Sequence, residues 1–265
     1  MKSFVNFEGQ AALVTGAGSP SGIGFATAKI LGELGAEVAI VSTTDRIFDR
    51  ARELEELGIK AKGYIADLMD REQVRQLAAK VIEDFGKVDV LINNAGMVQV
   101  GVEEDFSDFL DMTYESWDDE INRNLNIPLN VTKEILPFMV ERGYGRIVNT
   151  SSVTGPIVSN PGEASYSAAK AAIVGMSRAL AIEFGSKGIT VNSVLPGWIG
   201  TASQTEGEAA GGYNTPLKRS ATAEEVANGI VFLASKEASY ITGEALVIDG
   251  GNTIQEYKGP AELYY

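Results

Sequence analysis

The sequence predicts an α/β fold in which a parallel sheet of about seven strands is doubly wound, with helices on both faces. Two observations predict it. Short apolar runs alternate with longer amphipathic stretches along the 265 residues, and Val, Ile and Ala fill the short runs, as in strands buried on both faces. Repeated strand–helix–strand units imply right-handed crossovers. The chain shows no linker and no internal repeat, so we expect residues 1–265 to form a single domain.

The expected elements alternate in order. The strands are 11–15, 37–42, 60–65, 88–92, 146–151, 189–194 and 244–248, and the helices are 22–34, 46–57, 70–85, 117–141, 165–184 and 222–235. A glycine follows most helices and is expected to end each one in the left-handed conformation; these are Gly35, Gly58, Gly86, Gly143 and Gly185. Segments 101–113 and 201–216 do not fit the alternation, and both follow strand ends, where open sheets bind ligands.

Composition excludes several classes of function. Asp and Glu number 36 against 22 Lys and Arg, a net charge of −14, which disfavours nucleic acid as a partner. Histidine and cysteine are absent, so we expect no metal site, no Ser-His-Asp triad and no thiol catalysis. Proton transfer must then use a carboxylate, a lysine or a tyrosine. We find no signal peptide and no apolar run of membrane-spanning length, and we expect a cytoplasmic chain.

A glycine-rich turn, residues 15–24, follows the first expected strand and opens a helix. Glycines in such a turn let the backbone approach a pyrophosphate, and the helix N-terminus supplies amide groups and a favourable dipole. This placement predicts a Rossmann-type dinucleotide site.

Tyr166 and Lys170 lie four residues apart on a strong helical stretch, so they share a face. An ammonium beside a phenol favours the phenolate and lowers the pKa of the tyrosine. The pair is a usable acid/base in a chain without histidine, although this spacing alone also fits a surface pair.

The motifs gain weight from their order. Polar or glycine-rich motifs follow the strands in turn: 15–24, Asp67, 93–96, 151–152, then Tyr166 and Lys170 on the next helix, and 196–197. In identity, order and spacing they resemble the short-chain dehydrogenase/reductase family across nearly the whole chain, including 241–243 and 249–251 near its end.

The resemblance implies a catalytic set. The family's tyrosine and lysine match Tyr166 and Lys170, its serine matches Ser152 with Ser151 as the rival, and its helix asparagine matches Asn124. Tyr166 would exchange a proton with the substrate oxygen while Ser152 orients that oxygen. Lys170 would support the tyrosine and hold the nicotinamide ribose, and Asn124 would position a water.

The resemblance also implies which residues meet the cofactor and the substrate. With Tyr166 and Lys170, the cofactor residues are Gly16, Ser19, Ser21, Gly22, Ile23, Gly24, Asp67, Leu68, Asn94, Ala95, Gly96, Pro196, Gly197, Ile199 and Thr201. Val153, Glu163 and Trp198 are expected to line the substrate pocket, and 201–216 to close over it as a lid. Asn93 could instead only brace the central strand.

The end of the second strand bears on which nicotinamide cofactor is used. Asp45 lies about 20 residues past the glycines, as an acidic residue for a ribose 2′-hydroxyl would, but it lies beyond the strand end and could cap the next helix. The hydroxyls of Ser42, Thr43 and Thr44 can donate to a 2′-phosphate, and Arg46 adds charge. We therefore expect NADP(H), with NAD(H) as the alternative.

The expected reaction is hydride transfer between the nicotinamide and a secondary alcohol or ketone, a small-molecule substrate. The turn is longer than is common, with five residues between Gly16 and Gly22, and in length it resembles the enoyl reductase branch. That branch places its tyrosine and lysine seven apart, so carbonyl chemistry is preferred. The alternatives are a 3-oxoacyl thioester reductase and a catalytically idle, cofactor-binding regulator.

Helices near 117–141 and 165–184, with residues 222–248, resemble the surfaces through which this family forms homotetramers, so we expect one. Phe106, Phe109 and Leu110 of the acidic insertion 101–113 would be a pocket rim, a subunit contact, or part of a solvated loop.

Overall fold

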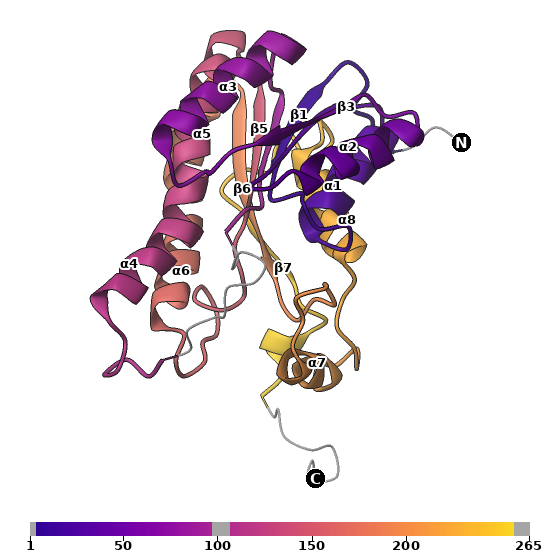
Figure 1. Cartoon of the computed structure of the whole chain (residues 1–265). Coiled ribbons are helices and arrows are strands. Elements are labelled where there is room, and N and C mark those ends of the chain that lie inside the picture. Colours follow the sequence, from indigo (N-terminus) through magenta and orange to yellow (C-terminus); the bar gives the residue numbers. More distant parts are fainter. Residues whose placement is uncertain (1–3, 97–106, 257–265) are drawn as a thin grey trace.

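The computed structural model describes residues 4–96 and 107–256. Its centre is a seven-stranded parallel sheet in the order β3-β2-β1-β4-β5-β6-β7 (Figure 1). The strands are β1 Ala11–Thr15, β2 Glu37–Ser42, β3 Ala61–Ile65, β4 Val90–Asn93, β5 Gly145–Thr150, β6 Ile189–Pro196 and β7 Ala245–Ile248. The chain runs outward from β1 to β3 and then from β4 to β7, so the predicted doubly wound α/β fold is confirmed.

Helices cover both faces of the sheet, α3, α5 and α6 on one and α1, α2 and α8 on the other (Figure 1). Their bounds are α1 Ile23–Glu33, α2 Arg46–Glu56, α3 Arg71–Phe85, α5 Ile127–Arg142, α6 Ala164–Phe184 and α8 Ala223–Ala234. Neighbouring strand residues point to opposite faces. Val14 packs in the cluster with α1 and α8, while Leu13 packs in the cluster with α3 and α5. Burial on both faces explains the uniformly apolar strands.

Three local predictions were wrong. The expected helix 117–141 is instead α4 Tyr114–Ile121, a π-helical turn η1 Asn122–Asn126, and α5. A short helix α7, Glu206–Tyr213, lies in the Gly-rich segment and starts with a capping box between Thr205 and Glu208, a signal that sequence analysis missed. Gly185 is right-handed because a 3₁₀ turn η2, Gly185–Lys187, continues α6, and Gly188 takes the left-handed conformation at φ 78°.

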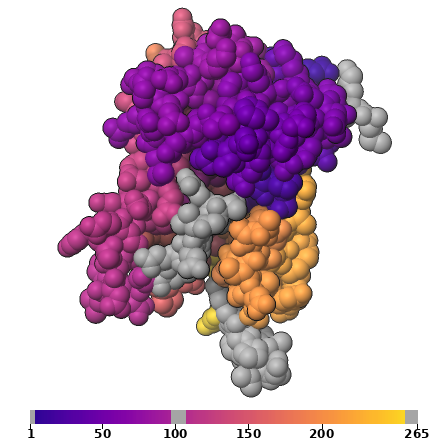
Figure 2. Space-filling view, viewed as in Figure 1, coloured from indigo at the N-terminus to yellow at the C-terminus, as the bar shows by residue number. Residues whose placement is uncertain are grey.

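The C-terminal ends of the strands carry α4 on one side and α7 on the other. Figure 2 shows the magenta surface around α4 and the orange surface around α7 as two separate lobes beneath the main body. A 3₁₀ turn, η3 Asn252–Ile254, follows β7 near the α7 lobe. In the described ranges no helix is long and apolar enough to span a membrane.

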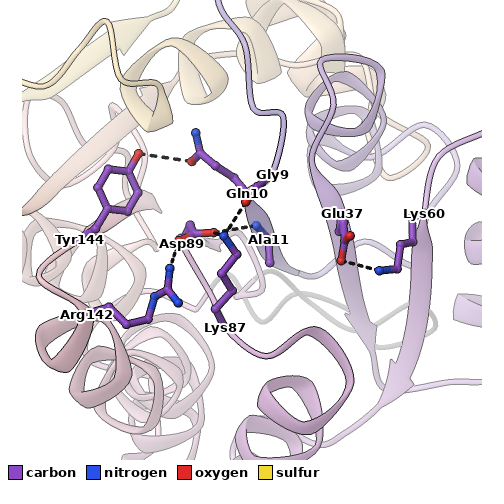
Figure 3. Close-up of polar contacts among 9 residues, drawn as sticks. All are labelled: Gly9, Gln10, Ala11, Glu37, Lys60, Lys87, Asp89, Arg142 and Tyr144. Atoms are coloured by element: carbon purple, nitrogen blue, oxygen red, sulfur yellow. Dashed lines mark hydrogen bonds and ion pairs between the residues drawn. The ribbon is translucent and has the colours of Figure 1, made fainter.

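At the N-terminal ends of the strands, a buried carboxylate joins neighbouring elements (Figure 3). Asp89 accepts hydrogen bonds from the Ala11 backbone N–H at 2.9 Å and from the guanidinium of Arg142 at 3.2 Å, and lies 2.9 Å from the Lys87 ammonium. These contacts tie β1, the start of β4 and the end of α5 together.

Candidate active site

The strand order places four of the predicted motifs next to one another. The loops after β1, β4, β5 and β6 leave the same edge of neighbouring parallel strands, which is where doubly wound sheets bind ligands.

The glycine turn has no room for side chains at its closest points. A Cβ on Gly16 would lie 2.8 Å from the Cα of Ala95, and one on Gly24 would lie 2.5 Å from the Gly16 carbonyl oxygen. The Asn94 side-chain amide donates to the carbonyls of Thr15 and Gly16 at 3.3 and 3.1 Å. The chain therefore forms a tight cradle at the start of α1, with the geometry that brings backbone amides to a phosphate.

The extra residues of the turn fold back onto its end. The Gly22 N–H donates to the Ser19 carbonyl at 3.1 Å, and Gly22 stands just before Ile23, the first residue of α1. Ser21 is exposed and Ser19 is half-buried. The Ser19 hydroxyl oxygen lies 3.7 Å from where a Gly22 Cβ would stand, so Ser19 lies next to the start of α1.

The end of β2 lies against the same turn. A Cβ on Gly18 would lie 2.9 Å from both the Arg46 Nε and the Ser42 Cβ. The Arg46 Nε is buried and has no hydrogen-bond partner within residues 4–96 and 107–256. The Ser42 hydroxyl donates to the Thr44 carbonyl at 2.9 Å. Thr43 is exposed at the end of the strand.

Asp45 is exposed and stands at the N-cap position of α2, but its side chain caps none of the described backbone N–H groups. The capping role that the sequence suggested for it is therefore wrong.

The loop after β3 is held by its own polar groups. The Asp67 carboxylate accepts from the Met69 N–H, and the Asp67 N–H donates to the Gln73 side chain, both at 3.0 Å. Leu68 is buried, and its carbonyl accepts from Asn130 at 3.1 Å.

A buried polar chain crosses the sheet beside β4. Asn93 donates to Thr132 at 2.9 Å and to Asn149 at 2.8 Å, and Asn149 donates to Ser177 at 2.8 Å. Asn93 thus joins β4 to α5 and β5, the bracing role that sequence analysis left open. Gly96, with φ 142°, ends the described part of this loop.

The two serines after β5 point in different directions. Ser151 is 4% exposed, and its hydroxyl donates to the Lys170 backbone carbonyl at 2.7 Å. Ser152 is half-buried, and its hydroxyl accepts from the Thr154 N–H at 3.1 Å. The Ser152 O–H therefore can still donate, whereas the Ser151 O–H already donates to the backbone of α6.

Tyr166 and Lys170 lie on the first two turns of α6. Lys170 is 3% exposed; its ammonium lies 5.4 Å from the centroid of the Tyr166 ring and 3.5 Å from the Thr150 carbonyl. Burial lowers the pKa of Lys170 to about 8, and the negative charge of Glu120 opposes that lowering. The structure therefore places an ammonium beneath a half-buried phenol at the end of β5.

Asn124 lies in the π-helical turn η1 and is 2% exposed. Such turns occur often at functional sites because they redirect side chains from a helix. Its Nδ2 donates to the Glu120 carboxylate at 2.6 Å, and its buried Oδ1 has no partner among the residues that the structure describes. Sequence analysis missed Glu120, although its spacing of four from Asn124 was visible.

The loop after β6 connects the sheet to α7. The carbonyl of Pro196 accepts from the Val153 N–H at 3.0 Å, and a Cβ on Gly197 would lie 2.7 Å from the Asp249 side chain. Ile199 forms an isolated bridge with Ala221.

The Trp198 ring packs against α7 so closely that a Cβ on Gly211 would lie 2.6 Å from it. Trp198 therefore anchors α7. Thr201 shares a hydrogen bond with Ser203 at 3.0 Å.

Val153 and Glu163, which were expected to line the substrate pocket, differ in burial. Val153 is 5% exposed and packs with Val174 and Leu195, so its side chain belongs to a small core cluster. Glu163 is half-buried at the N-cap position of α6, three residues before Tyr166, and its carboxylate accepts from the Asn160 side chain at 3.0 Å.

Of the acidic insertion, residues 101–106, including Phe106, lie outside the described ranges, while Phe109 and Leu110 are exposed. In the described part of the chain no acidic cluster could hold a metal ion.

Known proteins resemble the chain over almost all of its length. The family model described as enoyl-(acyl carrier protein) reductase matches residues 16–253. The chain is 40% identical over 260 residues to the oxidoreductase UcpA of Salmonella typhimurium, covering 94% of this chain and 96% of that one. It is 39% identical over 256 residues to the 3-oxoacyl-(acyl-carrier-protein) reductase FabG of Thermotoga maritima, covering 94% and 100%.

A solved structure shares the whole fold. The crystal structure of a “putative gluconate dehydrogenase” from Agrobacterium tumefaciens superimposes with a TM-score of 0.86 at 29% sequence identity, covering 94% of this chain and 97% of that one.

Proposed function

The chain belongs to the short-chain dehydrogenase/reductase family of oxidoreductases, and on that premise we propose that it transfers a hydride between a nicotinamide cofactor and a secondary alcohol or ketone. One observation carries the proposal: the buried Lys170 ammonium lies 5.4 Å from the Tyr166 ring centroid, at the sheet edge where the glycine cradle opens. Residues 1–265 would act as one catalytic domain.

In this proposal the residues of the chain move the proton and hold the substrate. In the reducing direction, Tyr166 donates its phenolic proton to the carbonyl oxygen and Ser152 donates a hydrogen bond to the same oxygen. The Lys170 ammonium stabilises the phenolate that results, and Asn124 positions a water that returns a proton. When bound, the nicotinamide supplies the hydride chemistry. Oxidation of the alcohol reverses each transfer.

The glycine cradle supports a dinucleotide as the cofactor. Gly16 and Gly24 keep the turn compact, because a Cβ there would meet the Ala95 and Gly16 backbone, and a turn without side chains at a helix N-terminus allows a phosphate to approach the backbone. In this proposal Ser19, Ser21 and the α1 amide groups hold the pyrophosphate, and Asp67 with Leu68 lies by the adenine. Asn94, Ala95 and Gly96 would meet the adenine ribose.

At the other end of the cofactor, Lys170 and Tyr166 would hold the nicotinamide ribose, and Pro196, Gly197, Ile199 and Thr201 would meet the carboxamide.

The end of β2 supports NADP(H) over NAD(H). The Arg46 Nε is a buried donor with no partner in the described ranges, 2.9 Å from where a Gly18 Cβ would stand. An unpaired buried donor is costly, and a 2′-phosphate there would satisfy it. Thr43 adds an exposed hydroxyl donor. The Ser42 hydroxyl, which donates to the Thr44 carbonyl, could donate to the phosphate only by giving up that bond, and Asp45 is exposed. Losing one charge-assisted contact by Arg46→Ala should cut kcat/KM for NADP(H) about ten- to a hundredfold and spare NAD(H). A tenfold wild-type preference for NAD(H) would overturn this choice.

Tyr166→Phe tests the reaction itself. A ketone and alcohol panel read by cofactor absorbance first gives a substrate; the variant should then lose at least about a hundredfold in kcat while its cofactor affinity stays nearly unchanged. Retention of a tenth of wild-type activity would refute the assignment and support a different reaction.

A 3-oxoacyl thioester reductase is the second candidate, favoured by the 39% identity to FabG. The net charge of −14 opposes docking of an acidic carrier protein. Measuring kcat/KM for an acetoacetyl thioester against simple ketones decides between the two, because a carrier-type enzyme should prefer the thioester by at least about tenfold. An idle regulator would turn over neither.

We propose that residues 201–216 close over the substrate, with α7 held against the Trp198 ring. Hydrogen exchange in this segment should slow when the cofactor and a substrate analogue bind, and equal exchange in both states would contradict closure.

We also propose a cytoplasmic homotetramer, for which light scattering should give four times the chain mass of 28.2 kDa.

A further inference from the structure

Glu120 is hydrogen-bonded to Asn124, a member of the proposed catalytic set. It lies in the last turn of α4, one helical turn before Asn124, and its side chain is 20% exposed. The Asn124 Nδ2 donates to the Glu120 carboxylate at 2.6 Å and to the Glu120 backbone carbonyl at 3.3 Å. One residue therefore accepts from this amide with both its side chain and its backbone.

This contact decides which way the Asn124 amide points. An ionised carboxylate only accepts hydrogen bonds, so a flipped amide would set two acceptor oxygens about 2.6 Å apart and leave Nδ2 without these partners. The observed orientation turns Oδ1 away from Glu120. That oxygen is buried, has no partner in the described ranges, and lies 3.5 Å from where a Gly96 Cβ would stand. Among the described residues it is therefore an acceptor without a donor.

Glu120 also faces a charge on another helix. α4 packs on α6, and the Lys170 ammonium and the Glu120 carboxylate attract each other. Burial raises the pKa of Glu120, and the positive charges of Arg123 and Lys170 oppose that rise. Arg123 reaches it from η1 at 3.8 Å. Within residues 4–96 and 107–256, the charged groups that act on Glu120 are thus Arg123 from η1 and Lys170, one turn after Tyr166, from α6.

We propose that Glu120 is a positioning residue of this site: it fixes the Asn124 amide with its oxygen free for a water, and its negative charge keeps Lys170 protonated. This inference rests on the proposed function, because both residues on which Glu120 acts belong to the proposed proton relay. A purely structural helix contact would have neither effect.

The charge of Lys170 can be measured without any substrate. In cofactor-free protein labelled with ¹⁵N at the lysine Nζ, an NMR titration reports the pKa of Lys170, whose signal is identified by its absence in Lys170→Met. Glu120→Gln keeps an acceptor for Asn124 but removes the charge. A nearby negative charge favours the protonated lysine, so in Glu120→Gln the Lys170 titration should move to lower pH than in the wild-type protein.

Activity supplies the second readout, with the ketone of highest turnover in the panel. Removing the negative charge eases proton loss from the Tyr166–Lys170 pair, so in Glu120→Gln the limb of the kcat/KM profile that reports this pair should move to lower pH. Glu120→Ala also frees the Asn124 amide and should lower kcat by about tenfold or more, with little change in KM.

Asp118→Asn is the matched control, because it removes one exposed carboxylate from the same helix and should leave both profiles unchanged. The inference would be overturned if both Glu120 variants kept the wild-type Lys170 titration and the wild-type kcat profile. If Glu120→Ala folds poorly, Glu120→Gln alone decides, because it is isosteric with the wild-type side chain. If Tyr166→Phe keeps its activity, the proposed function fails instead, and the NMR titration still tests the link between Glu120 and Lys170.

Discussion

Replacing Asp89 by alanine should remove a large part of the stability of the sheet while leaving its chemistry alone. The Asp89 side chain is 4% exposed and lies among three donors, the Ala11 N–H, Lys87 and Arg142 (Figure 3). Asp89 lies at the N-terminal end of β4, whereas the proposed active site lies at the C-terminal ends of the strands. The effect on stability can therefore be measured separately from the effect on turnover.

The magnitude follows from what each donor loses. The Ala11 N–H is buried, and an unpaired buried donor costs about 1–3 kcal/mol. Breaking a buried ion pair typically costs about 3–5 kcal/mol. The Lys87 and Arg142 side chains are 27% and 42% exposed, so water recovers part of their loss. We therefore expect a decrease of about 3 kcal/mol in the free energy of unfolding.

Urea unfolding followed by circular dichroism at pH 7 and fixed protein concentration measures this decrease. The control is Glu37→Gln at the same end of the strands, whose partner Lys60 lies 2.8 Å away with side chains 37% and 67% exposed. An exposed pair contributes about 0–1 kcal/mol, so the control should stay close to wild type. A loss below about 1 kcal/mol in Asp89→Ala at an unchanged m-value would refute the role given to the buried carboxylate.

The remaining predictions concern the active-site edge. Ser151→Ala should cost about 1 kcal/mol of stability and keep turnover, whereas Ser152→Ala should lower kcat at least about tenfold; the reverse pattern would make Ser151 the catalytic serine. Burial lowers the pKa of Lys170 from 10.5 to about 8, so at pH 7 folding buries a disfavoured charge. Lys170→Met should then abolish turnover yet raise the free energy of unfolding by about 1–3 kcal/mol. In the wild-type protein the free-energy cost of burying this charge should decrease as the pH rises from about 8 to 10.5, because the folded lysine loses its proton first. Thermal melts across that range should therefore show the stability advantage of Lys170→Met becoming smaller. Gly211→Val should displace the Trp198 ring, raising KM for the ketone with little change in cofactor affinity; unchanged kinetics would separate Trp198 from the substrate pocket.

Much of the fold was determined by the sequence alone. Strands buried on both faces read as apolar runs, so all seven were found, most with ends within a residue or two of those observed. Local spacing also predicts that Tyr166 and Lys170 share a face of α6, since one helical turn separates them. Both results depend on periodicities that are written directly along the chain.

The active-site details were decided by the tertiary structure. Ser151 and Ser152 are alike in sequence, and only packing against α6 turns the Ser151 hydroxyl inward to the Lys170 carbonyl. The interruption of the expected helix 117–141 by η1 is likewise not visible as a break in its apolar pattern. These features depend on contacts between segments far apart in the chain.

Charge and orientation show the same division. Sequence spacing could pair Glu120 with Asn124, but the approach of Lys170 comes from α6, and Arg46 meets Gly18 only because β2 lies beside β1. Electrostatic attraction and hydrogen bonding depend on distance in space and on burial, neither of which a linear pattern records. The sequence therefore determined which chemical groups reach this edge of the sheet, and the packing of helices on strands decided which of them face each other.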